Sequence, residues 1–266
     1  MSPEITNWEE VTFFSEEFDS QTGEFQCTTF AVVHDDVVYF GQLNIPKVEI
    51  SFQQLSSALS PIPDYDIFPA WPPADVQLTQ APETVPADVY IKRPSLALYD
   101  VFKEHHVLHL LSQGLIEEAQ VMELLSRHPH PNIIRYYGCR VRRRRITGLV
   151  LDRYPADLTN YLKNGLGTID KEPFMQALES AIHHLHSLGW AHNDLNPTNI
   201  LVNEAGMPIL IDLGSSHEIG KKLTTSRGTK GWIDEDMKDY TTSEKRHDIY
   251  ALAKIRVWLD EPTFEE

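Results

Sequence analysis

The chain has 266 residues, enough for one large domain or two small ones, and 41% of them are apolar, enough to build a core. Its formal net charge of −16 excludes general binding to nucleic acids. The two cysteines, Cys27 and Cys139, exclude a disulfide framework and indicate a reducing compartment, so we expect a cytoplasmic protein. We expect no signal peptide, because no apolar segment follows a basic start, and no membrane span.

Residues 1–75 carry most of the negative charge. They hold thirteen acidic residues against one basic residue, Lys47, which gives −12 of the total −16. We therefore expect an acidic N-terminal extension that ends near Asp75. Runs rich in Val, Thr, Phe and Tyr at 27–33 and 37–43 predict a β-hairpin within it. Solvation explains the acidic surface, and a docking role is the alternative.

The rest of the extension predicts little regular structure. Residues 52–59 predict a short helix, and five prolines between positions 61 and 73 predict an extended linker. Beyond the boundary, residues 76–79 and 88–92 have the composition of strands on either side of 80–87.

A helix is predicted next, at 116–125, where the apolar residues gather on one side. Residues 133–139 and 146–151 then predict paired strands. A run of arginines, Arg140 and Arg142–Arg145, lies where these strands connect. We interpret the run as a solvated hairpin tip; a patch for phosphate or acidic peptides and attraction to the acidic extension are the alternatives.

Residues 170–187 predict a long helix that Asp170 could cap. Phe174, Leu178, Ile182 and Leu185 share one face of it at helical spacing. The histidines near its end, at 183, 184 and 186, are expected to pack rather than bind a metal.

Two acids and an amide follow this helix: Asp194, Asn199 and Asp212. The apolar runs 200–202 and 209–211 predict two short strands around a turn, which would bring Asn199 and Asp212 together. Their oxygens are hard ligands suited to Mg²⁺. Asp194 is then a carboxylate placed to accept a hydroxyl proton. Alternatively, these residues merely cap turns.

The stretch His192-Asn-Asp-Leu-Asn-Pro-Thr-Asn and the later Asp212-Leu-Gly resemble two loops of protein kinases. These are the catalytic loop H-R-D-L-x-x-x-N and the metal-binding loop D-F-G. The resemblance implies that Asp194 is the catalytic base and that Asn199 and Asp212 hold the Mg²⁺ that accompanies ATP.

The same resemblance implies a bilobal α+β fold, with a β-rich small lobe at 76–151 and a partial, helical large lobe at 152–266. Two residues depart from the family pattern. Asn193 replaces the arginine that pairs with a phosphorylated activation loop, and Asn196 replaces the lysine that supports the transferring phosphate.

The sequence Val-Tyr-Ile-Lys, ending at Lys92, resembles the kinase strand Val-Ala-Ile-Lys, which implies that Lys92 pairs with the α- and β-phosphates. The sequence His-Pro-Asn-Ile-Ile at 130–134 sets the register for its partner. Glu118 is the implied partner, and Glu117 is the alternative. Residues 80–87 contain no glycine where the family has its glycine-rich loop, which favours a degenerate kinase.

Residues 149–158 resemble the kinase hinge. The resemblance implies that Leu151 is the gatekeeper and that the backbone from Asp152 to Tyr154 faces adenine.

Residues 215–229 occupy the position of the activation segment, where Thr224, Thr225, Ser226 and Thr229 are candidates for phosphorylation. Gly-Thr-Lys-Gly-Trp at 228–232 resembles the end of that segment, with Asp236 as its anchoring acid. Asp248 is implied to brace the catalytic loop. A helix near the C-terminus is expected to expose apolar residues, which would bind a partner, indicate a fragmentary gene product or lower the solubility. These residues are Leu252, Ile255, Val257, Trp258 and Leu259.

Three functions fit these residues. The first is an ATP- and Mg²⁺-dependent serine/threonine kinase acting on a protein substrate. The second is a pseudokinase that serves as a binding or scaffold module. The third is a small-molecule phosphotransferase of the aminoglycoside or choline kinase type. The kinase-like segments at 130–134 and 228–232 favour the protein-kinase branch over the third.

Overall fold

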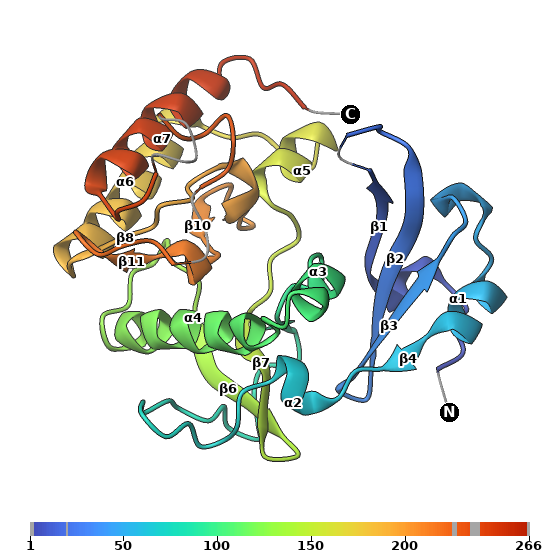
Figure 1. Cartoon of the computed structure of the whole chain (residues 1–266). Coiled ribbons are helices and arrows are strands. Elements are labelled where there is room, and N and C mark those ends of the chain that lie inside the picture. Colours follow the sequence, from blue (N-terminus) through green and yellow to red (C-terminus); the bar gives the residue numbers. More distant parts are fainter. Residues whose placement is uncertain (1–2, 20, 225–227, 235–239, 265–266) are drawn as a thin grey trace. The chain divides into compact units, whose positions relative to one another are not determined.

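The computed structural model describes residues 3–19, 21–224, 228–234 and 240–264 (Figure 1). The chain forms two compact units. The front unit contains Met1–Gln77, Arg93–Leu115 and Arg140–Gly148, and the main unit contains Leu78–Lys92, Ile116–Cys139 and Leu149–Glu266. The acidic extension and two later segments of the chain thus belong to the same compact unit. The division into an extension and two lobes stays a prediction.

The front unit is organised around an antiparallel sheet in the order β1-β2-β3-β4 (Figure 1). Its strands are β1 Val11–Phe18, β2 Phe25–His34, β3 Val37–Leu43 and β4 Ser60–Pro61. The predicted hairpin is confirmed as β2 and β3, with Thr28 opposite Leu43 and His34 opposite Val37. The sequence does not predict β1, because the adjacent Glu16 and Glu17 interrupt the alternation of polar and apolar residues.

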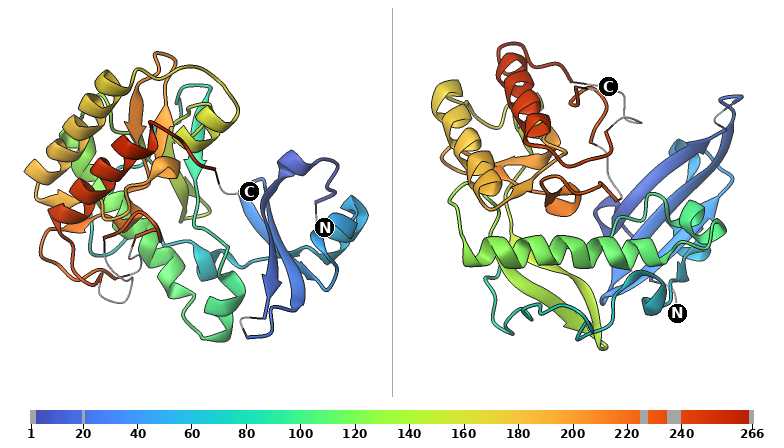
Figure 2. Two further views of the ribbon diagram at one scale, coloured as in Figure 1. Left: turned by 90° about the horizontal axis from the view of Figure 1, so that it is seen from above. Right: turned by 60° about the vertical axis from the view of Figure 1, so that its left-hand side comes forward.

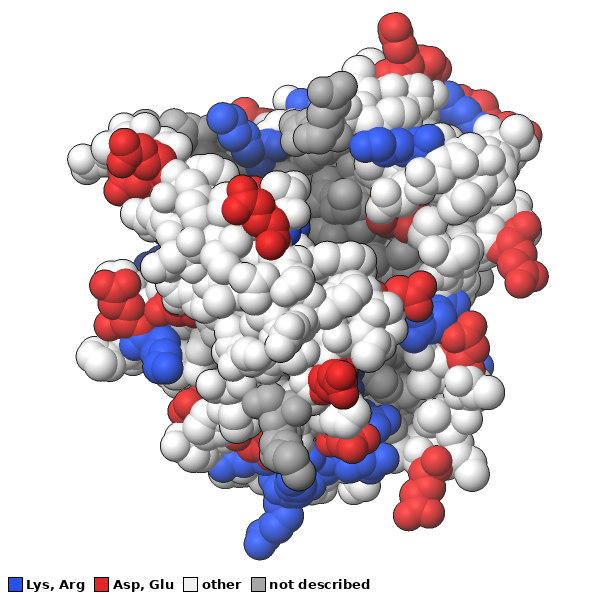
Figure 3. Space-filling view, turned by 90° about the vertical axis from the view of Figure 1, so that its right-hand side faces the viewer, with Lys and Arg blue, Asp and Glu red and all other residues white. Residues whose placement is uncertain are grey.

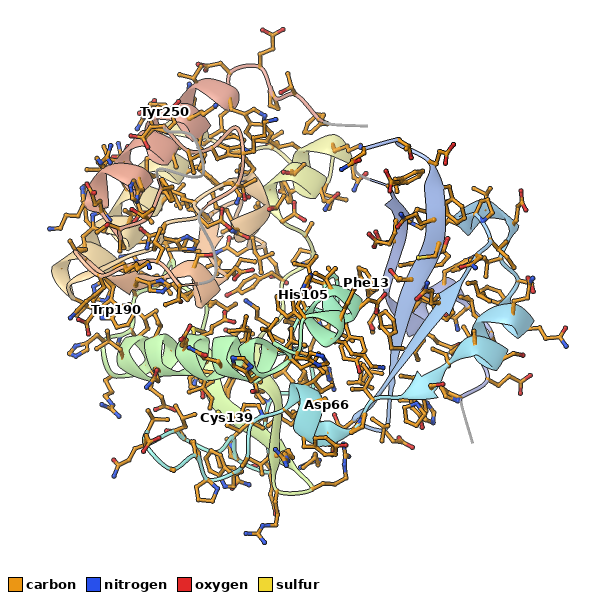
Figure 4. All side chains as sticks on the ribbon, in the orientation of Figure 1. Phe13, Asp66, His105, Cys139, Trp190 and Tyr250 are labelled. Carbon is orange, nitrogen blue, oxygen red and sulfur yellow. The ribbon has the colours of Figure 1, made fainter. Side chains whose placement is uncertain are left out.

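Both faces of this sheet are covered. The helices of the front unit are α1 Phe52–Ala58, α2 Asp64–Ile67 and α3 Tyr99–Glu104. Phe30 of β2 packs with Leu55 of α1, and the next residue, Ala31, packs on the other face with Tyr99 of α3. Figure 4 shows Phe13 of β1 on the face that carries α3. Since successive strand residues point to opposite faces, β2 is apolar on both.

The main unit contains the strand order β5-β7-β6. These strands are β5 Val89–Lys92, β6 Tyr136–Arg142 and β7 Arg145–Asp152, and their ends at 140–148 belong to the front unit. The three strands that the sequence predicts here are confirmed. The further strand expected at 76–79 is wrong: Thr79 accepts one backbone hydrogen bond from Cys139 (2.7 Å), and the next residue, Gln80, forms an isolated parallel bridge with Cys139.

A buried carboxylate explains this difference. Glu123 accepts hydrogen bonds from the backbone nitrogen of Thr79 (2.6 Å) and from its hydroxyl (2.9 Å). The backbone nitrogen of Thr79 is therefore not available to a neighbouring strand. Glu123 belongs to α4 His109–Arg127, which begins well before the predicted residue 116. The sequence hides this first part, because Ser112, Gln113 and Gly114 interrupt the apolar pattern.

The remaining elements of the main unit carry or support the loops after α6. They are α5 Leu158–Lys163, α6 Lys171–Ser187, β8 Trp190–Ala191, β9 Ile200–Val202, β10 Pro208–Leu210, β11 His217–Glu218 and α7 Lys245–Trp258. The predicted apolar face of α6 is fully buried. Asp170 stands at the N-cap of α6 as expected, but its side chain makes no capping hydrogen bond; its carbonyl accepts from Phe174 instead.

The helices α6 and α7 lie side by side (Figures 1 and 2). Arg256 of α7 pairs with Glu172 (2.8 Å) and Glu179 (3.0 Å) of α6. This packing corrects one expectation: Leu252 and Ile255 are buried, not exposed. Val257 is exposed, as expected, and so are Ile249 and Tyr250 of the same helix; Figure 4 labels Tyr250 on α7. Trp258 and Leu259 are half-buried.

Among the described residues, no helix has the length and apolar content needed to cross a membrane. The acidic side chains visible in Figure 3 lie apart from one another and form no single patch on that face. Such a distribution is typical of a solvated surface.

The arginines between β6 and β7 pair with acids of the extension, within the front unit. Asp36 lies in the turn between β2 and β3 and is buried. Its carboxylate accepts from Arg140 (2.7 Å) and from Arg93 (2.8 Å), and Arg143 pairs with Asp64 (2.7 Å). Of the three interpretations, attraction to the acidic extension therefore describes these arginines. Burial would raise the pKa of Asp36, but Arg140 and Arg93 outweigh it and hold the pKa below its usual range.

We predict that Asp36→Asn lowers the free energy of unfolding by about 2 kcal/mol at pH 7, because it removes the buried carboxylate that Arg140 and Arg93 share. A carboxyl with a lowered folded pKa stabilises above its unfolded pKa of about 4 and loses that contribution as the pH falls through its folded pKa. The deficit of the variant should therefore shrink below about pH 4.

The matched control is Asp35→Asn, since Asp35 also has a positive φ (50°, against 62° for Asp36) but its side chain is exposed. Chemical denaturation should show a change within about 0.5 kcal/mol for the control. Equal effects of the two substitutions would contradict the assigned role of Asp36.

Candidate functional site

Three charged side chains of the main unit meet at Lys92. Its Nζ lies 2.7 Å from Oε1 of Glu118 and 2.9 Å from Oδ1 of Asp212. Lys92 is the last residue of β5, Glu118 lies on α4, and Asp212 follows β10. The alternative partner, Glu117, is turned away and accepts from Thr224 instead.

The three groups set one another's charge. Burial acts to lower the pKa of Lys92, but Glu118 and Asp212 outweigh it and raise the pKa above its usual value. Burial acts to raise the pKa of Asp212, but Lys92 holds it below its usual value. Burial raises the pKa of Glu118, and Lys92 opposes that rise. Lys92 is therefore cationic at neutral pH and Asp212 is ionised, the state that a metal ligand requires.

The hairpin β9–β10 brings Asn199 next to Asp212. Leu201 pairs with Ile209 at its centre, and Ile211 donates its backbone N–H to the carbonyl of Asn199 (3.0 Å). Asp212 has a left-handed backbone (φ 58°), and its carboxylate accepts from Gly214 N (3.3 Å). A metal site at this position would have a carboxylate from Asp212 and an amide oxygen from Asn199, which is the donor chemistry that Mg²⁺ prefers.

The loop around Asp194 is fixed by side-chain amides. Asn199 Nδ2 donates to the carbonyl of Asp194 (2.8 Å), and Asn196 Nδ2 donates to the same carbonyl (3.1 Å). The Thr229 hydroxyl donates to Asp194 Oδ1 (2.7 Å), and Asn196 Nδ2 also reaches Thr229 Oγ1 (3.2 Å). Asp194 is thus held from three sides while its side chain stays half-buried.

The sequence does not predict this use of Thr229, which it marks only as a candidate for phosphorylation. Thr229 lies 35 positions after Asp194. One sequence signal could have predicted this contact: a glycine, Gly228, directly precedes Thr229. In the structure this glycine has a positive φ of 82°. Thr225, Ser226 and the proposed anchoring acid Asp236 lie outside the described residues.

Asp248 braces the loop from α7, the position that the kinase motifs imply for it. Its fully buried carboxylate accepts from the backbone nitrogens of His192 and Asn193, each at 2.8 Å. His186, which we expected to have a structural role, completes the arrangement with Nε2 at 2.8 Å from Asp248. His192 Nε2 in turn lies 2.9 Å from the carbonyl of Ile211, which links the loop to the residue before Asp212.

A pocket of about 330 Å³ opens beside Lys92 and Asp212. Its lining includes Leu151, Asp152 and Tyr154, the segment that resembles a hinge. Leu201 and Ile211 contribute apolar surface that the sequence does not single out. The size is suited to a small organic ligand, and charged side chains, Lys92 and Asp212 among them, could orient it.

Residues 80–87 do not contribute to this pocket within the described structure. Gln80 bridges to Cys139 of β6, and Ala81 N donates to the carbonyl of Cys139 (2.9 Å). β6 lies on the far side of β7 from β5, which ends at Lys92. The segment that replaces the glycine-rich loop is therefore attached to the opposite edge of this sheet.

Comparisons with known proteins identify the family of this chain. Residues 96–265 match the family model described as the protein kinase domain. The human serine/threonine-protein kinase/endoribonuclease IRE2 is 33% identical over 139 residues, which are 45% of this chain and 14% of that protein. A probable LIM domain-containing serine/threonine-protein kinase from Dictyostelium discoideum is 26% identical over 147 residues, 53% of this chain and 22% of that protein.

A third relative, mitogen-activated protein kinase kinase kinase 5 from Arabidopsis thaliana, is 25% identical over 144 residues, 52% of this chain and 20% of that protein. The chain thus spans less than a quarter of the length of each of these relatives. The mixed α+β fold expected from the motifs is confirmed. Because the matched segment covers more than half of its residues, the chain belongs to the protein kinase family.

Proposed function

We propose that this chain is a protein serine/threonine kinase that binds ATP with Mg²⁺ and transfers the γ-phosphoryl group to a hydroxyl of a protein substrate. The observation that carries the proposal is the position of Lys92 Nζ, within 2.9 Å of both Glu118 and Asp212. Asn199 lies next to Asp212 through its contact with Ile211. Lys92 and Asp212 line a pocket large enough for a nucleoside.

Each residue has a separate task in this proposal. Lys92 binds the α- and β-phosphates, and Glu118 keeps its ammonium group aimed at them. Asp212 and Asn199 hold Mg²⁺, which when bound neutralises charge on the phosphates. The backbone at Asp152 and Tyr154 contacts adenine, and Leu151 limits the depth of the pocket.

Asp194 accepts the proton of the attacking hydroxyl. Asn196 and Thr229 keep the loop of Asp194 in place, and the Thr229 hydroxyl fixes Oδ1 of the carboxylate. A carboxylate held by directed hydrogen bonds needs little reorganisation when the substrate binds. Asn196 is uncharged, so Lys92 and the metal supply the positive charge at the phosphates.

The arrangement of 80–87 favours a second candidate, a binding module without phosphoryl transfer. This segment is bonded to β6, and Pro82 and Pro86 have no N–H to offer a phosphate. A module of this kind would bind partners and would bind nucleotide weakly or not at all. The third candidate, a small-molecule phosphotransferase, is disfavoured because Thr229 contacts Asp194 and Gly228 lies against the carbonyl of Asn193, as expected of a segment that guides a protein substrate.

We predict that Asp212→Ala lowers Mg²⁺-dependent autophosphorylation, or transfer to a generic protein substrate, by about 100-fold or more, because it removes a metal ligand. Radiolabelled phosphate incorporation measures the rate. The control Glu204→Gln changes an exposed carboxylate in the turn of the β9–β10 hairpin and should leave the rate unchanged. Equal rates for wild type and Asp212→Ala would exclude the kinase proposal.

We predict that Thr229→Ala lowers the rate of transfer about tenfold or more, because a hydrogen bond to a charged group contributes roughly 1.5–3 kcal/mol. Thr229→Ser keeps the hydroxyl and should retain most of the activity. Steady-state kinetics should place the loss in kcat rather than in KM for ATP, since Thr229 contacts Asp194 and does not line the nucleotide pocket. A similar loss in the serine variant would disprove the role of the hydroxyl.

A further inference from the structure

The side chain of Asn193, the residue before Asp194, has four hydrogen-bond partners. It is 1% exposed. Its Nδ2 lies 2.9 Å from the carbonyl of Ala191, 3.2 Å from the carbonyl of Ser215 and 3.1 Å from the hydroxyl of Ser243. Its Oδ1 lies 3.2 Å from Nδ1 of His247. One buried amide thus contacts four separate parts of the main unit.

The orientation of this amide follows from its partners. The carbonyls of Ala191 and Ser215 can only accept, so the atom that faces them must be the NH₂ group. The Ser243 hydroxyl donates to the carbonyl of His217 (3.0 Å) and therefore accepts from Asn193. Oδ1 must then accept from His247, whose proton is on Nδ1. Burial lowers the pKa of His247, which agrees with a neutral ring.

The backbone N–H and carbonyl of Asn193 are also hydrogen-bonded. It has a left-handed conformation (φ 63°), which asparagine tolerates better than most residues. Its N–H donates to Asp248, and its carbonyl accepts from the Tyr240 hydroxyl (3.2 Å). A side chain on Gly228 would come within 3.1 Å of the same carbonyl. The position therefore joins the loop of Asp194 to both ends of the segment from Ser215 to Ser243.

We propose that Asn193 is a positioning residue, and that its neutral side-chain amide, as a donor, fixes the loop of Asp194 against Ser215 and Ser243. The inference rests on the proposed function for its catalytic consequence. A carboxylate has the same shape as the amide but cannot donate, so Asn193→Asp would place its oxygen against the oxygens of Ala191, Ser215 and Ser243. The substitution turns three attractive contacts into repulsive contacts between oxygen atoms. The volume of the side chain hardly changes.

The structure offers a matched control in Asn203, in the turn between β9 and β10. Its Oδ1 accepts from the backbone nitrogens of Ala205 (3.0 Å) and Met207 (2.9 Å). A carboxylate can accept both bonds equally well, so Asn203→Asp should be tolerated. The same chemical change therefore tests a donating amide at 193 and an accepting amide at 203.

The pH dependence of Asn193→Asp has a defined direction. The titratable and charged groups near the new carboxyl are His247, Asp248, Tyr240, His192 and Asp194, with Asp234, Glu244 and Arg246 around His247. Burial and the neighbouring carboxylates favour a protonated carboxyl, and an ionised one would favour a protonated His247. In both cases the folded variant binds more protons than the unfolded chain, so its deficit grows as the pH rises.

The experiment measures phosphoryl transfer, Mg²⁺–nucleotide affinity and the thermal midpoint for wild type, Asn193→Asp and Asn203→Asp at pH 6 and pH 8. For Asn193→Asp we expect kcat to fall on the order of 100-fold at pH 8 and to recover partly at pH 6. Nucleotide affinity should change less than about twofold, because Asn193 does not line the pocket. Asn193→Gly keeps the positive φ but removes the amide and should also lose activity, without the pH dependence.

Three results would overturn the inference: wild-type activity of Asn193→Asp at pH 8, an equal loss in Asn203→Asp, or a loss in Asn193→Asp that does not change with pH. Failure of the proposed function is distinguishable, since it would appear as no transfer by the wild type. In that case the thermal midpoints test the role of the Asn193 amide. The deficit of Asn193→Asp must be larger at pH 8 than at pH 6, and equal deficits would reject the role of the donating amide.

Discussion

The contact of Lys92 with Glu118 and Asp212 is the constraint on which the rest of this site depends. Three side chains from β5, α4 and the segment after β10 converge there, and in the proposed function their spacing defines where phosphates and a metal would lie. The lysine keeps Asp212 ionised, and the two carboxylates keep the lysine charged. This arrangement is sensitive to the loss of Lys92, because Glu118 and Asp212 would then lose the cation that they share.

The loops around this centre are held by buried polar groups. Asp248 accepts two backbone N–H groups of the loop that precedes Asp194, and Asn193 supplies the donors on the other side. Buried networks fix a single geometry only when every member is satisfied. The acceptors of the Asn193 side-chain NH₂ group are neutral, so its attachment to Ser215 and Ser243 requires no added charged group.

The sequence predicted the parts that local pattern controls. Short apolar runs separated by a turn predicted β9 and β10, and helical periodicity predicted the buried face of α6. Contacts over long separations were not predictable. Glu123 captures Thr79 and prevents the strand expected at 76–79, and α6 covers Leu252, which the sequence assigns to the surface. The contact of Thr229 with Asp194 and the pairing of Asp36 with Arg140 likewise depend on how the chain returns on itself.

The most direct test of the central claim is calorimetric titration of the wild-type chain with ATP, with Mg²⁺ present and with the metal chelated. If Lys92, Asp212 and Asn199 form one site for a nucleotide and its metal, ATP binds with Mg²⁺ at an affinity at least about tenfold higher than without it. The same affinity under both conditions, or no binding under either, would contradict a metal-assisted nucleotide site at these residues.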